Sequence, residues 1–301
     1  ARPNGLYAAR DPWGIRPLTV GMLPNGGHAV ASESGALRTL GCQAIREVKP
    51  GEIIMLTDTA LRVAQAIPPA SETALCTFEH IYFSRPDSFW DGQSVHQVRQ
   101  RLGEQLAREA AVPADVVIPV PDSSIPAAIG YARQSGIPYN DGFIKNRYIG
   151  RTFIEPTDSL RKMGVTLKYN VINENILNQR VVVIDDSIVR GNTTRPLVKL
   201  LQDAGAREIH LRITCPPIRH PCFMGVDMGT YEELAAHRHS LEEIRRFSGA
   251  DSLAYLSLEG MMNAIGRSNG YCNACFTGQY PFPVDAHVAK TGFEKPEGEP
   301  A

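Results

Sequence analysis

The sequence predicts an α/β protein, with a parallel sheet flanked by helices and a β-rich unit ahead of it. Two apolar, strand-like runs each lead into a polar loop and then a helix-like stretch, and a third apolar run follows the second helix. The first segment of the chain instead contains short β-like pieces without helical periodicity. Strand, helix and strand in succession are typical of parallel sheets with right-handed crossovers.

The N-terminal β-rich unit is expected over residues 1–69. Turn signals at Asn25-Gly26-Gly27 and Pro50-Gly51 separate its strand-like pieces, which are Leu18–Met22, His28–Ser32 and Ile53–Thr57. Consecutive prolines in Ile67-Pro68-Pro69 favour an extended linker. We therefore expect a domain boundary there and a second domain over residues 70–301.

In the second domain, Ser94 is expected to cap a helix with one apolar face, formed by Val95, Val98, Leu102 and Leu106. Further strands are expected at Ala114–Val120, Arg180–Ile184 and His210–Thr214. Further helices are expected at Ala127–Ala132, Pro196–Ala204, Glu232–Phe247 and Ser257–Ile265. Ligands of parallel sheets bind beyond the carboxyl ends of the strands. The loops after Val120 and Ile184 are therefore the candidate site.

Composition and charge exclude several classes of protein. Lys plus Arg number 31 and Asp plus Glu 32, giving a net charge of −1, so there is no polybasic footprint for nucleic acid. The longest aliphatic runs, such as Val181–Ile184, are far shorter than the ~20 residues that cross a bilayer. The first residues lack the apolar core of a secretory signal, and six cysteines are too few for a disulfide scaffold. We expect a cytoplasmic protein without nucleic-acid or membrane partners.

The strongest signal is VVVIDDSIVRGNTT, residues 181–194, in which an apolar strand ends in two acids. Asp185 and Asp186 are placed to accept hydrogen bonds from sugar hydroxyls or to help hold Mg²⁺. The residues that follow supply backbone N–H groups, hydroxyls and a helix N-terminus, which suit a phosphate. Gly191 lets the backbone close on the anion. The alternative is a capped turn with solvated acids, but the apolar strand before it and Gly-Asn-Thr-Thr after it favour a binding site.

This stretch resembles the phosphoribosyl-pyrophosphate (PRPP) signature of type I phosphoribosyltransferases. Other stretches resemble amidophosphoribosyltransferases (glutamine PRPP amidotransferases), namely CTFEHIYFSRPDS (76–88), VIPVPDSS (117–124), KNRYIGRTFIEP (145–156) and SNGYCNACFTGQYP (268–281). The opening ARDPWGIRPL (9–18) resembles the later part of that family's N-terminal-nucleophile glutaminase domain. The resemblance spans nearly the whole chain.

The resemblance implies transfer of the phosphoribosyl group of PRPP to ammonia from glutamine, which yields 5-phosphoribosylamine and pyrophosphate and begins purine (IMP) synthesis. Carried over to this chain, Asp185 and Asp186 hold the ribose and Mg²⁺, and Ser123 contributes to the metal site. The residues implied to hold the 5′-phosphate are Ser187, Ile188, Val189, Arg190, Gly191, Asn192, Thr193 and Thr194. The family also implies a homotetramer inhibited by purine nucleotides.

Residues Lys145–Lys168 carry six basic residues against two acids. Such a stretch alone is usually a solvated face. Its resemblance to the family's mobile loop implies that it closes over PRPP. The residues implied to be catalytic are Lys145, Arg147, Arg151 and Lys168.

The pair Cys272-x-x-Cys275 alone fits a redox pair, half of a zinc site or part of an iron–sulfur site. A redox pair is expected at a helix start after a strand, whereas a turn signal, Ser268-Asn269-Gly270, precedes this one. The resemblance adds Cys76 and Cys222 and implies a structural [4Fe–4S] cluster, with a four-cysteine zinc ion as the alternative. The remaining cysteines, Cys42 and Cys215, are expected in the core.

The chain departs from the family at its start. The glutaminase nucleophile is an N-terminal cysteine, whereas residue 1 is Ala and no cysteine precedes Cys42. We therefore expect a fragment that lacks most of the glutaminase domain and uses at most ammonia. The alternatives are a salvage phosphoribosyltransferase and a non-catalytic regulator that senses PRPP.

Overall fold

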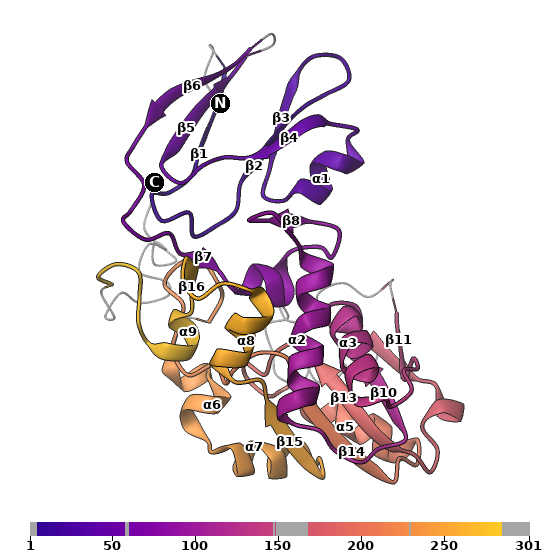
Figure 1. The fold of residues 1–301 in the computed structure, drawn as a ribbon. Helices are drawn as coiled ribbons and strands as arrows, with labels where there is room; N and C mark the ends of the chain where they lie inside the picture. The colour runs from indigo at the N-terminus through magenta and orange to yellow at the C-terminus, as the bar shows by residue number, and fades with distance from the viewer. Residues whose placement is uncertain (1–4, 58–59, 147, 149–167, 229, 285–301) are drawn as a thin grey trace, which may run out of the picture.

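The computed structural model describes residues 5–57, 60–146, 148, 168–228 and 230–284. Figure 1 shows a small β-rich unit at one end of the molecule and a larger α/β domain at the other. We call the described residues up to 69 the β unit, and those from 70 onward the α/β domain. Among the described residues, no helix combines the length and apolar character that crossing a bilayer requires.

The β unit contains two antiparallel sheets. One has the order β1-β5-β6 and is formed by Leu6–Ala9, Glu52–Leu56 and Leu61–Ala66. The other has the order β3-β2-β4 and is formed by His28–Ala31, Thr19–Met22 and Gln43–Glu47, with the short helix α1 at Ser34–Thr39. Their small core is formed by Ala8, Val20, Val48, Ile54 and Leu56.

The three strands that the sequence predicts in the β unit are confirmed as β2, β3 and β5. The strands β4 and β6 lacked a sequence signal because their residues are mostly exposed or half-buried and show no clean alternation. The sequence shows no helical periodicity of useful length in this unit, and the helix that occurs there, α1, is only six residues long. Residues 67–70 form neither helix nor strand, as expected of a linker, and the domain boundary itself stays a prediction.

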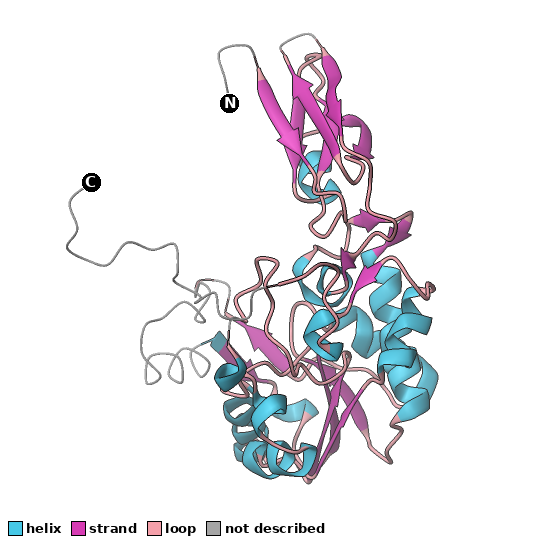
Figure 2. Cartoon of the chain, turned by 90° about the vertical axis from the view of Figure 1, so that its left-hand side faces the viewer, coloured by secondary structure: helices cyan, strands magenta, loops and turns pink. Residues whose placement is uncertain are grey.

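The α/β domain is built on a parallel sheet, as the sequence predicts, and the sheet has four strands where the sequence predicts three. Its order is β10-β13-β14-β15, formed by Val116–Pro119, Arg180–Asp185, Glu208–Ile213 and Ser252–Tyr255. Figure 2 shows helices on both sides of this sheet. The main helices are α2 (Val95–Glu109), α3 (Ile125–Ser135), α5 (Thr194–Asp203), α7 (Leu241–Ser248) and α8 (Leu258–Ile265).

Short elements complete the domain. They are β7 (Leu75–Cys76), the π-helical turn η1 (Glu79–Phe83), β8 (Phe89–Trp90), β9 (Gln93–Ser94), β11 (Phe143–Lys145), β12 (Tyr169–Val171), η3 (Asn173–Asn175), η4 (Tyr231–Glu233), α6 (Ala235–Arg238), β16 (Tyr271–Cys272) and α9 (Ala274–Thr277). In Figure 1, β7 and β16 lie together where the β unit meets the α/β domain.

The single helix expected at Glu232–Phe247 is wrong, because the structure has η4, α6 and α7 there. A capping box at Ser240 explains the break. Its hydroxyl accepts a hydrogen bond from the Glu243 N–H, and the Glu243 carboxylate accepts one from the Ser240 N–H. These bonds start a new helix, so His239 before it is extended. The strand β15 was not predicted because it is only four residues long and follows that helix directly.

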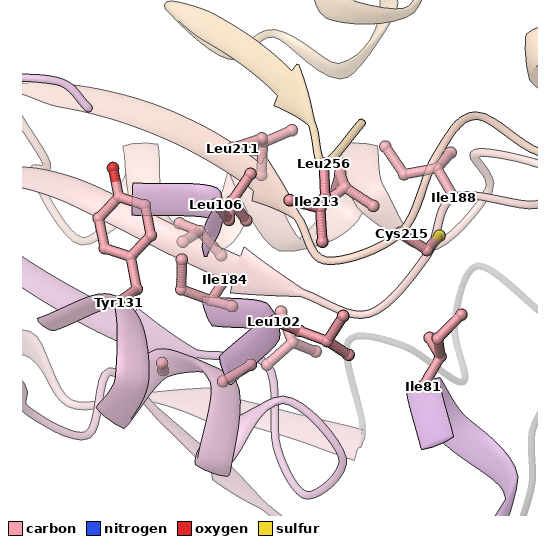
Figure 3. Close-up of a cluster of buried hydrophobic side chains, with 14 of the residues drawn as sticks. Ile81, Leu102, Leu106, Tyr131, Ile184, Ile188, Leu211, Ile213, Cys215 and Leu256 are labelled. Atoms are coloured by element: carbon pink, nitrogen blue, oxygen red, sulfur yellow. The ribbon is translucent and has the colours of Figure 1, made fainter. Parts of the chain in front are cut away.

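A continuous core packs between the sheet and the helices. The predicted apolar face of α2 is confirmed, since Val95, Val98, Leu102 and Leu106 are fully buried. Ser94 occupies the predicted cap position but makes no side-chain capping bond. Figure 3 shows part of this core, including Ile184, Ile188, Leu211, Ile213 and Cys215. The core therefore continues beneath the loop that follows β13.

Helices α2 and α3 approach each other at two glycines, Gly103 and Gly130. A Cβ on Gly103 would overlap the carbonyl oxygen of Ala127, and a Cβ on Gly130 would overlap that of Gln100. The two backbones are therefore in contact, which only glycine permits.

We predict that Gly103→Ala lowers the free energy of unfolding by about 1–3 kcal/mol, the usual cost of overpacking. In a helix without this contact, the same change would raise it by about 1 kcal/mol. Urea unfolding measures the difference, with Arg108→Ala on the exposed face of α2 as the control, expected to change it by less than about 0.5 kcal/mol. A Gly103→Ala variant more stable than the starting protein would contradict the contact.

Candidate active site

The two predicted loops meet at the carboxyl ends of β10 and β13. Pro119 lies beside Ile184 in the register of the sheet, and Asp185 lies beside Ile213. The Val120 N–H donates to the Ile184 carbonyl at 2.9 Å, which joins the two strand ends. The loop after Val120 therefore lies next to Asp185 and Asp186.

The Asp186 carboxylate is held between two hydroxyls. Ser123 Oγ donates to Oδ2 at 2.6 Å, and Ser187 Oγ donates to Oδ1 at 2.7 Å. Asp185 Oδ1 accepts the backbone N–H of Asp186 at 2.9 Å. Asp186 is only 8% exposed, whereas Asp185 is half-buried. The structure thus brings together the three residues that the sequence assigns to the metal site.

Burial makes the charge of this carboxylate pair unfavourable. The pKa of Asp185 lies well above its ordinary value because burial removes water from the carboxylate, and the adjacent Asp186 charge raises it further. Burial also raises the pKa of Asp186, while the Ser123 and Ser187 hydroxyls oppose that rise. A divalent cation or a pair of sugar hydroxyls would relieve this cost. The oxygen donors suit Mg²⁺, which often takes one or two carboxylates together with substrate phosphates.

The residues of the predicted phosphate loop have different structural roles. Ile188 is buried in the core, and the Val189 carbonyl accepts the Ala235 N–H at 2.8 Å. Arg190 Nη2 lies 3.0 Å from a Glu233 carboxylate oxygen. The backbone at Gly191 has a φ of +75°, the left-handed region that favours glycine. These residues shape the turn, and the side chains of Ile188 and Arg190 are engaged with the protein.

The end of the loop leads into α5. Thr193 is its N-cap residue, without a side-chain capping bond, and Thr194 is its buried first residue. Asn192 is exposed beside them. A helix start of this kind directs backbone N–H groups and the positive end of the helix dipole toward an anion.

A hairpin packs against the loop after β10. Lys145 and Tyr169 lie opposite each other in β11 and β12. Lys145 Nζ lies 2.5 Å from Asp122 Oδ2, and the Tyr169 hydroxyl donates to the Pro121 carbonyl at 3.2 Å. The Pro121–Asp122 peptide is cis. Lys145 therefore lies at the site.

Lys168 is buried, with Nζ 5.5 Å from the centre of the Tyr169 ring. Arg147 and Arg151 lie outside the described residues. Tyr169 was not predicted to lie at the site, because no local sequence pattern marks it. Asp122 was not predicted either, although it lies within the VIPVPDSS stretch that resembles the family.

The four predicted cysteine ligands lie on three separate segments that approach one another. Cys76 lies beside Cys272 in the β7–β16 pairing, and Cys275 lies on α9. The Cys222 N–H donates to the Met228 carbonyl at 2.8 Å. Burial raises the pKa of Cys76 to about 12. Burial and the three neighbouring thiols of the set also raise the pKa of Cys275 well above its ordinary value.

Two details of the cysteine analysis need correction. A short strand, β16, precedes Cys275 and a short helix, α9, contains it, where the sequence indicated only a turn. Cys215 is fully buried as expected, but Cys42 is half-buried, so its assignment to the core was wrong. In the part of the chain that the structure describes, no three His, Cys, Asp or Glu side chains are grouped to hold a metal ion.

Known proteins show what this chain is similar to. No family model matches it. It is 52% identical over 284 residues to the amidophosphoribosyltransferase of Archaeoglobus fulgidus and 51% identical over 284 residues to that of Bacillus subtilis. Each match covers 93% of this chain, but only 62% and 59% of those relatives. The chain thus spans about 60% of the length of the curated relatives it matches.

Two solved structures share its fold. One is the glutamine PRPP amidotransferase of B. subtilis complexed with ADP and GMP, with a TM-score of 0.86 and 48% identity over 97% of this chain and 65% of that one. The other is described as the allosteric regulatory enzyme of purine biosynthesis, with a TM-score of 0.84 and 47% identity over 96% of this chain and 63% of that one. The predicted fold class is therefore confirmed.

We predict that Asp185→Asn raises the free energy of unfolding of the ligand-free protein by on the order of 1 kcal/mol at pH 8. The folded-state pKa lies above the ordinary value of 3.8, so the carboxyl favours the fold at low pH and loses that contribution as pH rises. The gain should therefore be smaller at pH 5. Urea unfolding without divalent ions measures it.

Asp203→Asn is the control for this prediction, because Asp203 is exposed and forms an ion pair with Lys199 on the surface of α5. Its free energy of unfolding should change by less than about 1 kcal/mol at both pH values. Destabilisation by Asp185→Asn at pH 8 would show that the carboxylate charge is not costly there.

Proposed function

We propose that the α/β domain of this chain, which is 52% identical over 284 residues to the amidophosphoribosyltransferase of Archaeoglobus fulgidus, transfers the phosphoribosyl group of PRPP to ammonia. The products would be 5-phosphoribosylamine and pyrophosphate. In the whole protein the ammonia would come from glutamine, and the reaction would begin the synthesis of the purine nucleotide IMP. The observation that carries this proposal is Asp186, held between Ser123 and Ser187 at the strand end that leads into α5.

The reaction needs the sugar to be held while its bond to pyrophosphate breaks. The nitrogen lone pair of ammonia forms the new bond to C1 of the ribose, the electrons of the C1–O bond leave with pyrophosphate, and the nitrogen loses a proton to solvent. Asp185 and Asp186 would accept hydrogen bonds from the ribose hydroxyls. Their negative charge would also favour the positive charge that develops on the ring. The Thr193–Thr194 turn and the start of α5 would bind the 5′-phosphate.

The departing pyrophosphate needs positive charge. Among the described residues, Lys145 is a cation placed for this role, because it lies next to the loop after β10. When bound, Mg²⁺ would neutralise negative charge on pyrophosphate, with Asp185, Asp186 and Ser123 as its protein-side oxygen groups. We assign Lys168 to the same side of the site, through its contact with Tyr169. For Arg147 and Arg151 the catalytic role stays a prediction from resemblance.

We further propose that Cys76, Cys222, Cys272 and Cys275 hold a [4Fe–4S] cluster. Four thiols from three separate segments support this, because that is the number such a cluster takes. A four-iron cluster is larger than one ion, so its ligands stand farther apart than those of zinc. A zinc ion held by the same four thiols is the alternative. When bound, the cluster would link the C-terminal segment to β7.

We also propose a homotetramer in the cytoplasm that purine nucleotides inhibit. The nucleotides bound in the B. subtilis structure support the inhibition, because that protein shares 48% of its sequence with this chain over the matched region.

We predict that a polypeptide of residues 1–301 releases pyrophosphate from PRPP when Mg²⁺ and ammonia are present. Asp186→Asn should lower kcat/KM by about 100-fold or more, since it removes a charge aimed at the transition state. The control is Asp203→Asn on the exposed face of α5, which should match the starting protein. Glutamine should not replace ammonia in this polypeptide, because the nucleophile would be a cysteine and none precedes Cys42. A pyrophosphate-release assay with ammonia or with glutamine measures the effect of Asp186→Asn and the choice of nitrogen donor.

Other outcomes of this assay favour other functions. Pyrophosphate release only with a free purine or pyrimidine base would indicate a salvage enzyme. Tight binding of PRPP without turnover would indicate a regulator. Glutamate formed from glutamine would contradict the ammonia-only expectation.

We predict about four irons per chain after anaerobic reconstitution with iron and sulfide. Cys222→Ser should lower the iron content, whereas Cys42→Ser, which alters a cysteine outside the set, should leave it unchanged. Elemental analysis and the visible absorption of the cluster measure both. One zinc per chain without iron would support the zinc alternative instead.

A further inference from the structure

Residues 79–91, which we call the junction segment, form one of the contacts between the β unit and the α/β domain. Another joins Trp13 and Ile15 to residues 74–76 through backbone hydrogen bonds. Three backbone N–H groups of the junction segment donate to side chains of the β unit. These are Arg85 to Glu33 at 2.8 Å, Phe89 to Ser34 at 3.0 Å and Asp91 to Glu47 at 2.8 Å. Part of the attachment of the β unit is therefore made of hydrogen bonds to the backbone of this segment.

Arg99 of α2 holds the other side of the junction segment. Its guanidinium donates to the carbonyls of His80 at 2.7 Å and Ser84 at 2.8 Å, which lie close to the two ends of η1. Arg99 is only 2% exposed. The segment is thus fixed on the α/β domain and offers its outer side to the β unit.

A buried carboxylate lies between the two sides. Glu79 is 4% exposed, and each of its oxygens has a different partner. Oε1 lies 3.0 Å from Arg16 Nη2 of the β unit, and Oε2 accepts from Ser84 Oγ at 2.6 Å. The Ser84 hydroxyl in turn accepts from the indole N–H of the fully buried Trp90 at 2.6 Å.

Arg16–Glu79 is the only ion pair between described residues that joins the β unit to the α/β domain. The remaining polar contacts between the β unit and the junction segment each have a backbone group or a hydroxyl on at least one side. Those of Arg38 and of the Arg85 N–H are exposed to water. Contacts of that kind tolerate small shifts because water can replace a lost partner. A buried carboxylate has no such replacement.

We propose that the Arg16–Glu79 pair sets the position of the β unit on the α/β domain, with Glu79 as the positioning residue. It acts by penalising other arrangements, because a displaced β unit would remove Arg16, the cation that contacts the Glu79 carboxylate directly. The carboxylate would keep the Ser84 hydroxyl and the more distant charge of Arg99. Buried ion pairs often add little net stability over apolar replacements, yet removal of one partner is strongly destabilising. Such a free-energy penalty selects one arrangement of the two units and does not by itself strengthen their association. This proposal concerns the joint alone and stands whether or not the phosphoribosyl reaction is confirmed.

Burial raises the pKa of Glu79, which agrees with a carboxylate whose ionised form is costly there. The charged groups that face it are Arg16 of the β unit, Arg99 of α2 and Glu33 of the β unit, beside the Ser84 hydroxyl. Arg99 donates to backbone carbonyls and stays in place when the β unit moves. Arg16 is therefore the partner whose presence depends on docking.

A double-mutant cycle with Arg16→Met and Glu79→Gln tests the proposal. Amide exchange over residues 85–91 reads docking directly, since three of these amides donate to the β unit, and exchange over β13 reports the rest of the fold. We expect Arg16→Met to accelerate exchange over 85–91 by about tenfold or more and to leave β13 unchanged. Adding Glu79→Gln should restore exchange to within about threefold of the starting protein, because the unpaired charge is gone.

Arg38→Met is the matched control. Arg38 also reaches from the β unit to the junction segment, but it donates to the exposed carbonyl of Asp87 at 2.9 Å and meets no buried carboxylate. It should accelerate exchange by less than about threefold. In a Trp13→Phe background, Trp90 is the single tryptophan, and its emission should shift to the red in Arg16→Met alone.

Three results would overturn the proposal. They are a double variant that exchanges as fast as Arg16→Met, an Arg16→Met variant that behaves like Arg38→Met, and acceleration that extends equally to β13. If Arg16→Met does not fold, Glu79→Gln alone decides. It should exchange within about threefold of the starting protein, whereas a tenfold acceleration would mean that attraction, not the penalty, holds the joint.

Discussion

The main physical constraint on this structure is the free-energy cost of placing two adjacent, negatively charged carboxylates at the end of a buried strand. The strand β13 has neighbours on both sides, and its apolar residues are fully buried. Asp185 and Asp186 therefore emerge from the core into a place where water is scarce, and their charges are unfavourable without partners. The hydroxyls of Ser123 and Ser187 partly satisfy one of them. The remaining cost is what a cation and a polyhydroxyl ligand are suited to relieve.

The elements around this pair supply what it lacks. Parallel pairing in register places the loop after β10 against the end of β13, so Ser123 reaches Asp186. The chain then turns through Gly191 into α5, whose N-terminus faces the same region with donors instead of acceptors. Acceptors for a sugar and donors for a phosphate thus lie within one continuous loop, because strand ends and helix starts offer opposite groups.

Buried polar groups also join distant parts of the chain elsewhere. The junction segment joins the β unit to the α/β domain around Glu79, and the four cysteines gather β7, α9 and the region of Cys222. In both places a buried polar group would cost free energy without a partner, and its partners come from separate segments of the chain. Such groups select one arrangement over others, whereas apolar contacts alone tolerate displacement. The close α2–α3 contact at Gly103 also selects one arrangement of the two helices, in this case by shape.

The sequence by itself determined the parallel sheet, the apolar face of α2 and the loop that ends in Asp185 and Asp186. Those features depend on neighbours in the chain, so periodicity and strand-to-loop transitions reveal them. Only the tertiary structure decided that Arg16 pairs with Glu79, that Tyr169 contacts Pro121 and that Ile188 faces the core. It also added β15 and divided the helix expected at Glu232–Phe247, because a capping box and sheet pairing outweighed local propensity there. These contacts join residues far apart in sequence or depend on side-chain geometry, which no local pattern records.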